Sequence, residues 1–179
     1  MREKTTILKR EMAGVFFISL FGGLLHFVFA LLGKWSPVAL IAAVNESVWE
    51  HLKLAFWPAL LFALIEWPYF RKQNKNFWAA KAFGIFTMPI IIVSVFYTYT
   101  ALAGHHILWV DISVFVIAVF VGQMISARLL QIPSIDLKIR IVALILIVLM
   151  IVAFSLFTFF PPPLPPFCDP QTGQYGILK

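Results

Sequence analysis

The hydrophobic and polar positions of this chain are arranged in long blocks, with five apolar segments separated by short polar ones. Apolar segments of this length form helices in a bilayer, because the hydrocarbon core offers no water to pair with backbone amides. About 20 apolar residues are needed to cross that core. The pattern therefore predicts an all-α, polytopic membrane helix bundle with five transmembrane helices. The five segments cover residues 12–33, 38–70, 82–104, 107–131 and 141–160.

The second segment, residues 38–70, is too long for a simple span. As one helix it would extend about 50 Å, against a hydrocarbon core of about 30 Å. Two interpretations remain open: either one long helix bends near Pro58, or residues 38–51 form a re-entrant half helix before the second span. Irregular backbone at membrane depth is tolerated only beside protein or a water-filled cavity. Under either interpretation, we expect the polar residues of this segment to line a cavity.

The composition excludes an ordinary soluble domain. The chain is 61% hydrophobic and only 12% charged, with a mean hydropathy of +0.93, whereas soluble domains are about half apolar and a quarter charged. The formal net charge of +6 would also fit a nucleic-acid-binding protein. However, the basic residues lie in short clusters between apolar segments, with no basic patch interleaved with aromatic residues, so we expect no nucleic-acid partner. The single Cys168 excludes an internal disulfide.

The basic residues are distributed unevenly between the two sides that five spans would create. Most of them precede the first span, lie between the second and third, or lie between the end of the fourth span and the start of the fifth. Because Lys and Arg accumulate in cytoplasmic loops, we expect a multi-pass protein of the cell membrane with a cytoplasmic N-terminus and an extracytoplasmic C-terminus. These residues are Arg2, Lys4, Lys9, Arg10, Arg71, Lys72, Lys75, Lys81, Arg128, Lys138 and Arg140.

The C-terminal segment differs from the rest of the chain. Residues 161–166 are Pro-rich, and residues 167–176 are dense in turn-forming residues. We therefore divide the chain into a single transmembrane helical domain, residues 1–160, and an extracytoplasmic tail, residues 161–179. The tail is a candidate lid over an outward-facing site.

One short motif places several ionisable groups within the second apolar segment. It reads Asn45-Glu46-Ser47-Val48-Trp49-Glu50-His51-Leu52-Lys53. On a continuous helix at 100° per residue, Glu46, Glu50 and Lys53 would share one narrow stripe, flanked by Asn45 and His51. Ionisable groups in a bilayer are costly and usually face a bundle interior or a wet cavity. The motif therefore marks the candidate functional site.

Two kinds of chemistry fit this motif. Two carboxylates one helical turn apart share a proton, pair with a cation or bind a metal. We therefore predict that Glu46, Glu50 and His51 act as general acid and base or as metal ligands. In the structural alternative, Lys53 simply neutralises Glu50.

Carboxylate and imidazole ligands suit a divalent transition metal such as zinc, iron or manganese. No HExxH pair is present to strengthen this prediction. We expect the groups to converge on a cavity that opens outward, with Asp111 either joining them or capping its own helix. The predicted metal ligands are His26, Glu46, Glu50, His51 and His105, and the predicted substrate-binding residues are Asn45, Trp49, Lys53, Asp111 and Asp169.

Two motifs carry a resemblance to a known family: residues 45–53, given above, and Phe167-Cys168-Asp169-Pro170-Gln171-Thr172-Gly173-Gln174-Tyr175-Gly176. At these positions the sequence resembles an uncharacterised family of small prokaryotic integral membrane proteins, defined as a domain of unknown function. The resemblance covers nearly the whole chain. It implies a five- or six-helix membrane protein and carries over no activity.

Three functions remain open at this point. The first is an intramembrane enzyme whose Glu46, Glu50 and His51 act on a lipid or isoprenoid substrate that enters from the membrane. The second is a membrane protein that binds or transports a small molecule or a cation. The third is a structural subunit of a larger membrane complex.

Overall fold

The computed structural model describes residues 2–71 and 74–177. Lys72, one of the basic residues counted above, and the last two residues of the tail lie outside the described residues. Within them the chain is helical, and its only β feature is an isolated bridge between Cys168 and Tyr175.

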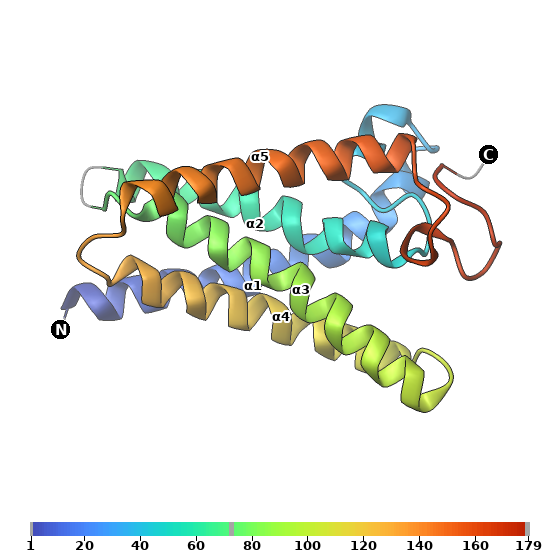
Figure 1. Ribbon diagram of the computed structural model, residues 1–179, viewed down its shortest axis with the longest axis horizontal. Coiled ribbons are helices and arrows are strands. Elements are labelled where there is room, and N and C mark those ends of the chain that lie inside the picture. Colours follow the sequence, from blue (N-terminus) through green and yellow to red (C-terminus); the bar gives the residue numbers. More distant parts are fainter. Residues whose placement is uncertain (1, 72–73, 178–179) are drawn as a thin grey trace.

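Five long helices form the bundle, and each is long and apolar enough to cross a membrane (Figure 1). This confirms the all-α, five-span prediction. The helices are α1 (Arg2–Leu31), α2 (Val48–Phe70), α3 (Phe77–Ala103), α4 (Leu108–Leu130) and α5 (Leu137–Phe159). Two short 3-10 turns, η1 (Ser36–Leu40) and η2 (Pro165–Phe167), lie outside them.

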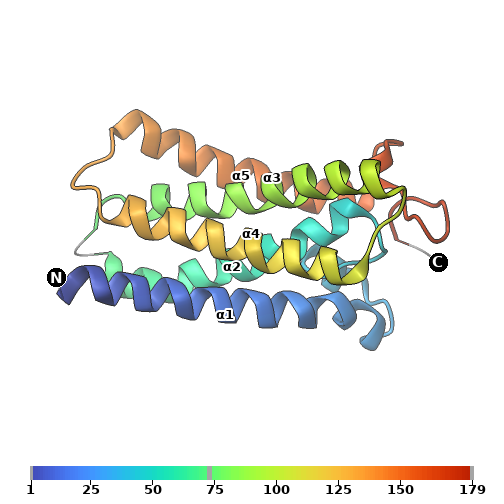
Figure 2. The ribbon, with the colours of Figure 1, turned by 90° about the horizontal axis from the view of Figure 1, so that it is seen from below.

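The helices run roughly along one long axis, so the start of α1 and the tail lie at opposite ends of the molecule (Figures 1 and 2). The helices α3 and α4 make the most extensive contact, and α1 packs against both α2 and α4. The helix α5 packs against α3 and contacts η1. The end with the tail therefore gathers the end of α1, η1, the start of α2 and the end of α5.

The segment before α2 is neither a continuous helix nor a half helix. The 3-10 turn η1 is followed by a non-helical loop, residues 41–47, and α2 begins at Val48. The long-helix interpretation of residues 38–70 is therefore wrong, and the partial segment before the true span is a 3-10 turn and a loop instead of the expected half helix over residues 38–51. Most of this segment is buried between protein elements, as irregular backbone at this depth requires.

The close contact between α3 and α4 depends on two glycines. A Cβ added to Gly84 would lie 2.6 Å from the backbone oxygen of Gly122, and one added to Gly122 would lie 2.6 Å from that of Gly84. A backbone oxygen cannot move aside as a side chain can. The pair therefore sets how closely α3 and α4 pack, as small residues do in membrane helix pairs.

We expect Gly84→Ala to destabilise the bundle by about 1–3 kcal/mol, the usual cost of an overpacked core. The measurement is the thermal unfolding midpoint of the detergent-solubilised protein, followed by circular dichroism. Gly23→Ala is the matched control, because a Cβ at Gly23 meets no atom within 4 Å. Equal midpoints for the two variants would contradict the role of the Gly84–Gly122 contact.

Candidate functional site

The polar motif lies where the loop of residues 41–47 enters α2. Ser47 is the N-cap of this helix, and its hydroxyl oxygen accepts a hydrogen bond from Glu50 N at 3.4 Å. Asn45 Oδ1 in turn accepts from Ser47 N at 2.9 Å. Glu46 therefore precedes the helix. The prediction that Glu46 and Glu50 share one helical stripe is wrong, because the helix begins between them.

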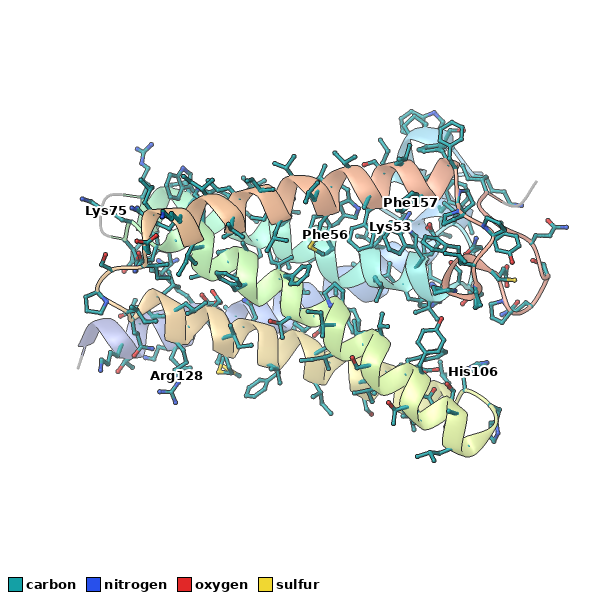
Figure 3. The ribbon with its side chains drawn as sticks, viewed as in Figure 1. Lys53, Phe56, Lys75, His106, Arg128 and Phe157 are labelled. Carbon is teal, nitrogen blue, oxygen red and sulfur yellow. The ribbon has the colours of Figure 1, made fainter. Side chains whose placement is uncertain are left out.

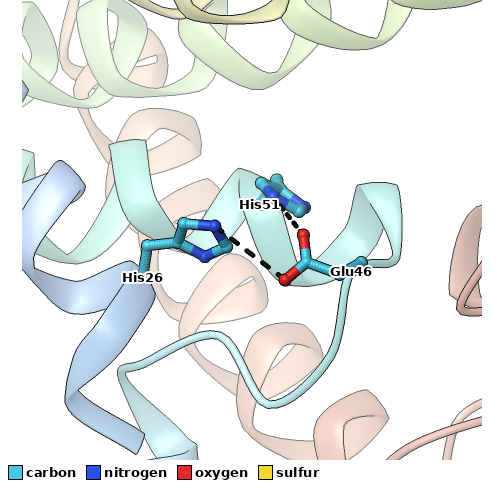
Figure 4. A group of neighbouring side chains, drawn as sticks. All are labelled: His26, Glu46 and His51. Carbon is cyan, nitrogen blue, oxygen red and sulfur yellow. Dashed lines mark ion pairs between the residues drawn. The ribbon is translucent and has the colours of Figure 1, made fainter. Parts of the chain in front are cut away.

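Three side chains from separate elements point toward one another at this place (Figure 4). His26 comes from α1, Glu46 from the loop and His51 from the first turns of α2. His51 Nε2 lies 3.5 Å from Glu46 Oε2, and His26 Nε2 lies 3.9 Å from Glu46 Oε1. One ligand atom from each residue lies within 4.8 Å of the other two. We call these three residues the His–Glu–His site.

The orientation of His51 is set by the backbone. Its Nδ1 lies 2.9 Å from the carbonyl oxygen of Ser47. A carbonyl oxygen only accepts, so Nδ1 carries the proton and Nε2 of the neutral ring presents a lone pair. That lone pair faces the Glu46 carboxylate. This arrangement orients metal-binding histidines in many proteins. The other imidazole lacks such support, since His26 Nδ1 is buried with no partner among the described residues.

The His–Glu–His site is half-buried and lies near one end of the bundle. The side chains of His26, Glu46 and His51 are 28%, 38% and 37% exposed. His26 precedes the end of α1 by five residues, about 7–8 Å along the helix axis. The site is thus shielded on the helix side while part of each ligand residue remains accessible.

Glu50 is not part of the His–Glu–His site. Its carboxylate forms a buried ion pair with Lys53, with Nζ 2.6 Å from Oε2. Lys53 Nζ also donates to Ala39 O and to Thr158 Oγ1, each at 2.8 Å, while Glu50 Oε2 accepts from Val44 N at 3.1 Å. All three ammonium protons are used and Lys53 is 0% exposed. The prediction of Glu50 as a metal ligand and partner of Glu46 is therefore wrong in geometry, and the structural alternative describes this pair.

The tail packs on the start of α2. Asn45 Nδ2 donates to Gly176 O at 2.8 Å, and the Trp49 ring lies 4.7 Å from that of Phe167, between centroids. Asp169 is buried and its Oδ1 accepts from Gln171 N at 2.8 Å. In this structure, Asn45 and Trp49 hold the tail against the helix bundle, and Asp169 stabilises a turn within the tail. Their predicted contact with a substrate stays a prediction.

His105 and Asp111 do not join the site. Both lie at the junction of α3 and α4, where Asp111 pairs with His106 at 3.3 Å and accepts a hydrogen bond from the Tyr99 hydroxyl. Figure 3 places His106 at the tip of the α3–α4 hairpin, well separated from Lys53. The prediction that His105 and Asp111 converge with His51 is wrong, because this hairpin diverges from α2 and α5 toward its tip (Figure 1).

A second buried charged cluster is missing from the sequence-based predictions. Lys81 Nζ lies 2.7 Å from Glu11 Oε1 and 2.5 Å from Glu66 Oε2, and Ser126 donates to Glu11 Oε1 at 2.9 Å. All four side chains are buried, although Lys81 was counted among the loop cations. A signal was present in the sequence, because Glu11, Glu66 and Lys81 carry opposite charges at the ends of three apolar segments that five spans place on the same side. The cluster joins α1, α2, α3 and α4 near the end opposite the His–Glu–His site.

Removing either partner of the buried Glu50–Lys53 pair should destabilise the protein. Lys53→Met leaves a buried carboxylate without a counter-charge, and Glu50→Gln leaves a buried ammonium. We expect each substitution to lower the free energy of unfolding by about 3–5 kcal/mol. The stability loss of the double variant should be clearly smaller than the summed losses of the two single variants, because the double variant buries neither a lone carboxylate nor a lone ammonium.

The measurement is the thermal unfolding midpoint in detergent of both single variants and the double variant. Glu46→Gln, in the neighbouring but half-exposed carboxylate, is the control; with a chelator in every sample, so that no bound metal contributes, we expect it to change stability by less than about 1 kcal/mol. Additive losses in the double variant would contradict the pairing.

Comparison with known proteins gives a family and no activity. No curated protein and no solved structure matches the chain. A family model described as a family of unknown function (DUF6512) matches residues 1–177. This match covers nearly the entire chain, as the resemblance of the two motifs implied, and the five-helix bundle with its His–Glu–His site therefore belongs to the DUF6512 family.

Proposed function

We propose that this protein is an integral membrane metalloenzyme that binds a divalent transition metal, most simply zinc, at His26, Glu46 and His51. In this proposal it acts on a lipid or isoprenoid substrate at the membrane surface. One observation carries the proposal: His51 Nε2 lies 3.5 Å from a Glu46 carboxylate oxygen, while its Nδ1 faces the carbonyl oxygen of Ser47.

Two groups that both present lone pairs repel unless a positive charge lies between them. That charge is either a proton on the imidazole or a metal ion. The distances favour the metal. Zinc bonds of about 2.0–2.1 Å in tetrahedral geometry separate neighbouring ligand atoms by about 3.3 Å. The observed separations are 3.5 and 3.9 Å between the imidazole nitrogens and the two different Glu46 oxygens, and one ligand atom from each residue lies within 4.8 Å of the other two, so a small inward movement of the side chains would reach that value.

The number of ligands supports a catalytic rather than a structural metal. Two histidines and one glutamate leave a fourth position for water or substrate, whereas structural zinc sites are closed by four protein ligands. Zinc held there would lower the pKa of bound water to about 7 and polarise a carbonyl or phosphoryl oxygen. The half-exposed ligand side chains leave room for such a group.

The position of the site favours an amphipathic substrate. His26 lies within an apolar helix, near its end, and exposed apolar side chains surround this end of the bundle, including Phe27, Leu31 and Trp35. A lipid that packs its apolar chain against these side chains would place the bond between its head group and that chain near the His–Glu–His site. The tail, hydrogen-bonded to Asn45, would then cover the substrate as a lid.

A second candidate function is capture or transport of a metal cation. It is favoured by the use of Glu50 in the ion pair with Lys53, which removes the second carboxylate predicted as an acid–base group. Binding alone needs only the three ligand residues, whereas hydrolysis also needs proton transfer to the leaving group. Without a metal, the Glu46–His51 pair offers the acid–base alternative.

We expect about one equivalent of zinc in the purified protein and less than about a tenth in His26→Ala, Glu46→Gln and His51→Ala. Elemental analysis of the detergent-purified proteins measures this directly. His105→Ala is the matched control, because this exposed loop histidine lies away from the site, and it should retain the metal. Equal zinc content in all variants, or none in the wild type, would refute the metal site.

The same samples are then assayed for cleavage of mixed membrane lipids, followed by release of the head group or the acyl chain. Turnover in the wild type and in His105→Ala, but not in Glu46→Gln, is the expected result. Bound metal without turnover would support cation capture instead.

We also propose that the end of the bundle bearing the start of α1 faces the cytoplasm. Lys75 lies at this end, as does Arg128, while Lys53 and His106 mark the other (Figure 3). A periplasm-type alkaline phosphatase fused after residue 177 should be active, and a cytoplasmic reporter fused there should be inactive. The reverse result would overturn the proposed orientation and place the His–Glu–His site on the cytoplasmic side.

A further inference from the structure

A polar pocket lies at the end of the bundle opposite the His–Glu–His site, and neither the proposed enzyme nor its alternatives use it. Its volume is about 520 Å³. The pocket is formed by the start of α1, residues 74–76 before α3, the α4–α5 loop and the first turn of α5. It therefore lies where four elements meet at one end of the bundle.

Among the described residues, the charges that line this pocket are all positive. Lys4, Lys75 and Arg140 contribute them, and none of the described carboxylates lines the pocket. In the α4–α5 loop, the carboxylate of Asp136 is used to cap α5, where its Oδ1 accepts from Lys138 N at 2.7 Å. The N-terminus of α5 adds the positive end of its helix dipole on the same side. The charge pattern selects an anionic ligand.

The walls of the pocket are fixed by hydrogen bonds between the two loops. Asn74 Nδ2 donates to Leu130 O and Asn76 Nδ2 donates to Ile132 O, each at 2.7 Å. Asn76 Oδ1 also accepts from Ile135 N at 3.0 Å. Both amides are thus used to join the α2–α3 loop to the α4–α5 loop. The pocket is preformed, which lowers the entropic cost of binding.

Arg140 offers an unsatisfied donor at this place. Its Nη1 donates to Lys75 O at 3.4 Å, whereas its Nε is buried and has no partner among the described residues. A buried donor without a partner costs free energy that a ligand oxygen would recover. The parallel N–H groups of a guanidinium match two oxygens of a phosphate or carboxylate group.

We propose that this pocket binds the phosphate group of an anionic membrane lipid. Phosphate oxygens suit one guanidinium and two ammonium groups, and basic pockets at the ends of membrane helices bind such head groups. The lipid source is favoured by the apolar side chains beside the pocket, since Ile132, Leu137 and Ile141 are exposed. They would contact acyl chains while the head group enters the pocket. The proposal does not depend on the proposed enzyme function.

The test uses the full-length protein in neutral detergent and the shift of its thermal unfolding midpoint with added lipid. The probes are dihexanoyl phosphatidylglycerol, the zwitterionic dihexanoyl phosphatidylcholine and inorganic phosphate. Phosphatidylglycerol should raise the midpoint, and the other two should raise it much less. In Arg140→Gln and Lys75→Gln, the concentration for half of the effect should increase on the order of tenfold, the loss of one charge-assisted contact.

Lys138→Gln is the matched control, because this exposed lysine in the first turn of α5 does not line the pocket. It should respond to phosphatidylglycerol as the wild type does. If Arg140→Gln fails to fold, Lys75→Gln alone decides, since Lys75 is exposed. Equal responses to both lipids, or unchanged responses in Lys75→Gln, would overturn the proposal. An equal shift with inorganic phosphate alone would assign the pocket to free phosphate and overturn the lipid assignment.

Discussion

The buried ion pair between Glu50 and Lys53 is the interaction on which the candidate site depends. A lone charge buried in a bundle costs several kcal/mol, so the two groups must lie together and their remaining hydrogen-bonding positions must be filled. They are filled by Ala39 O, Val44 N and Thr158 Oγ1. These partners come from η1, from the loop before α2 and from the end of α5. Satisfying one pair of charges therefore fixes three elements around the start of α2.

This arrangement places the neighbouring residues of the motif for a different use. With Glu50 turned into the bundle and Ser47 capping the helix, Glu46 is left outside the helix and beside α1. His51 follows Glu50 by one residue, or about 100° around the helix, and so faces His26 instead of Thr158. The motif thus divides between a structural half, Glu50 and Lys53, and an accessible half, Glu46 and His51. Adjacent residues have these separate roles because a helix presents them on different faces.

The two ends of the bundle differ in the sign of the accessible groups that they present to a ligand. At the end with the tail, a carboxylate and two imidazoles face one another with access to the outside. At the other end, Lys81 lies between Glu11 and Glu66 inside the bundle, while Lys4, Lys75 and Arg140 line a pocket to which no described residue contributes a carboxylate. One end therefore suits a cation and the other an anion. Between them the described helices are joined by apolar packing and by close backbone contact at Gly84 and Gly122.

The sequence by itself determined the number of spans, the helical class and the place of the polar motif, because hydropathy is a local property and a bilayer forces apolar segments into helices. It also contained a local signal for the start of α2, since Ser47 and Glu50 have the spacing of a helix-capping pair. Only the tertiary structure decided which charges meet. Thr158 lies 108 residues from Glu50, and Glu11 lies 70 residues from Lys81. Contacts between such distant positions depend on how the helices pack, and no periodicity within one segment encodes that. For the same reason His26 could be joined to Glu46 and His51 in the fold, while His105 and Asp111, equally plausible as ligands by residue type, lie on a hairpin that diverges from them.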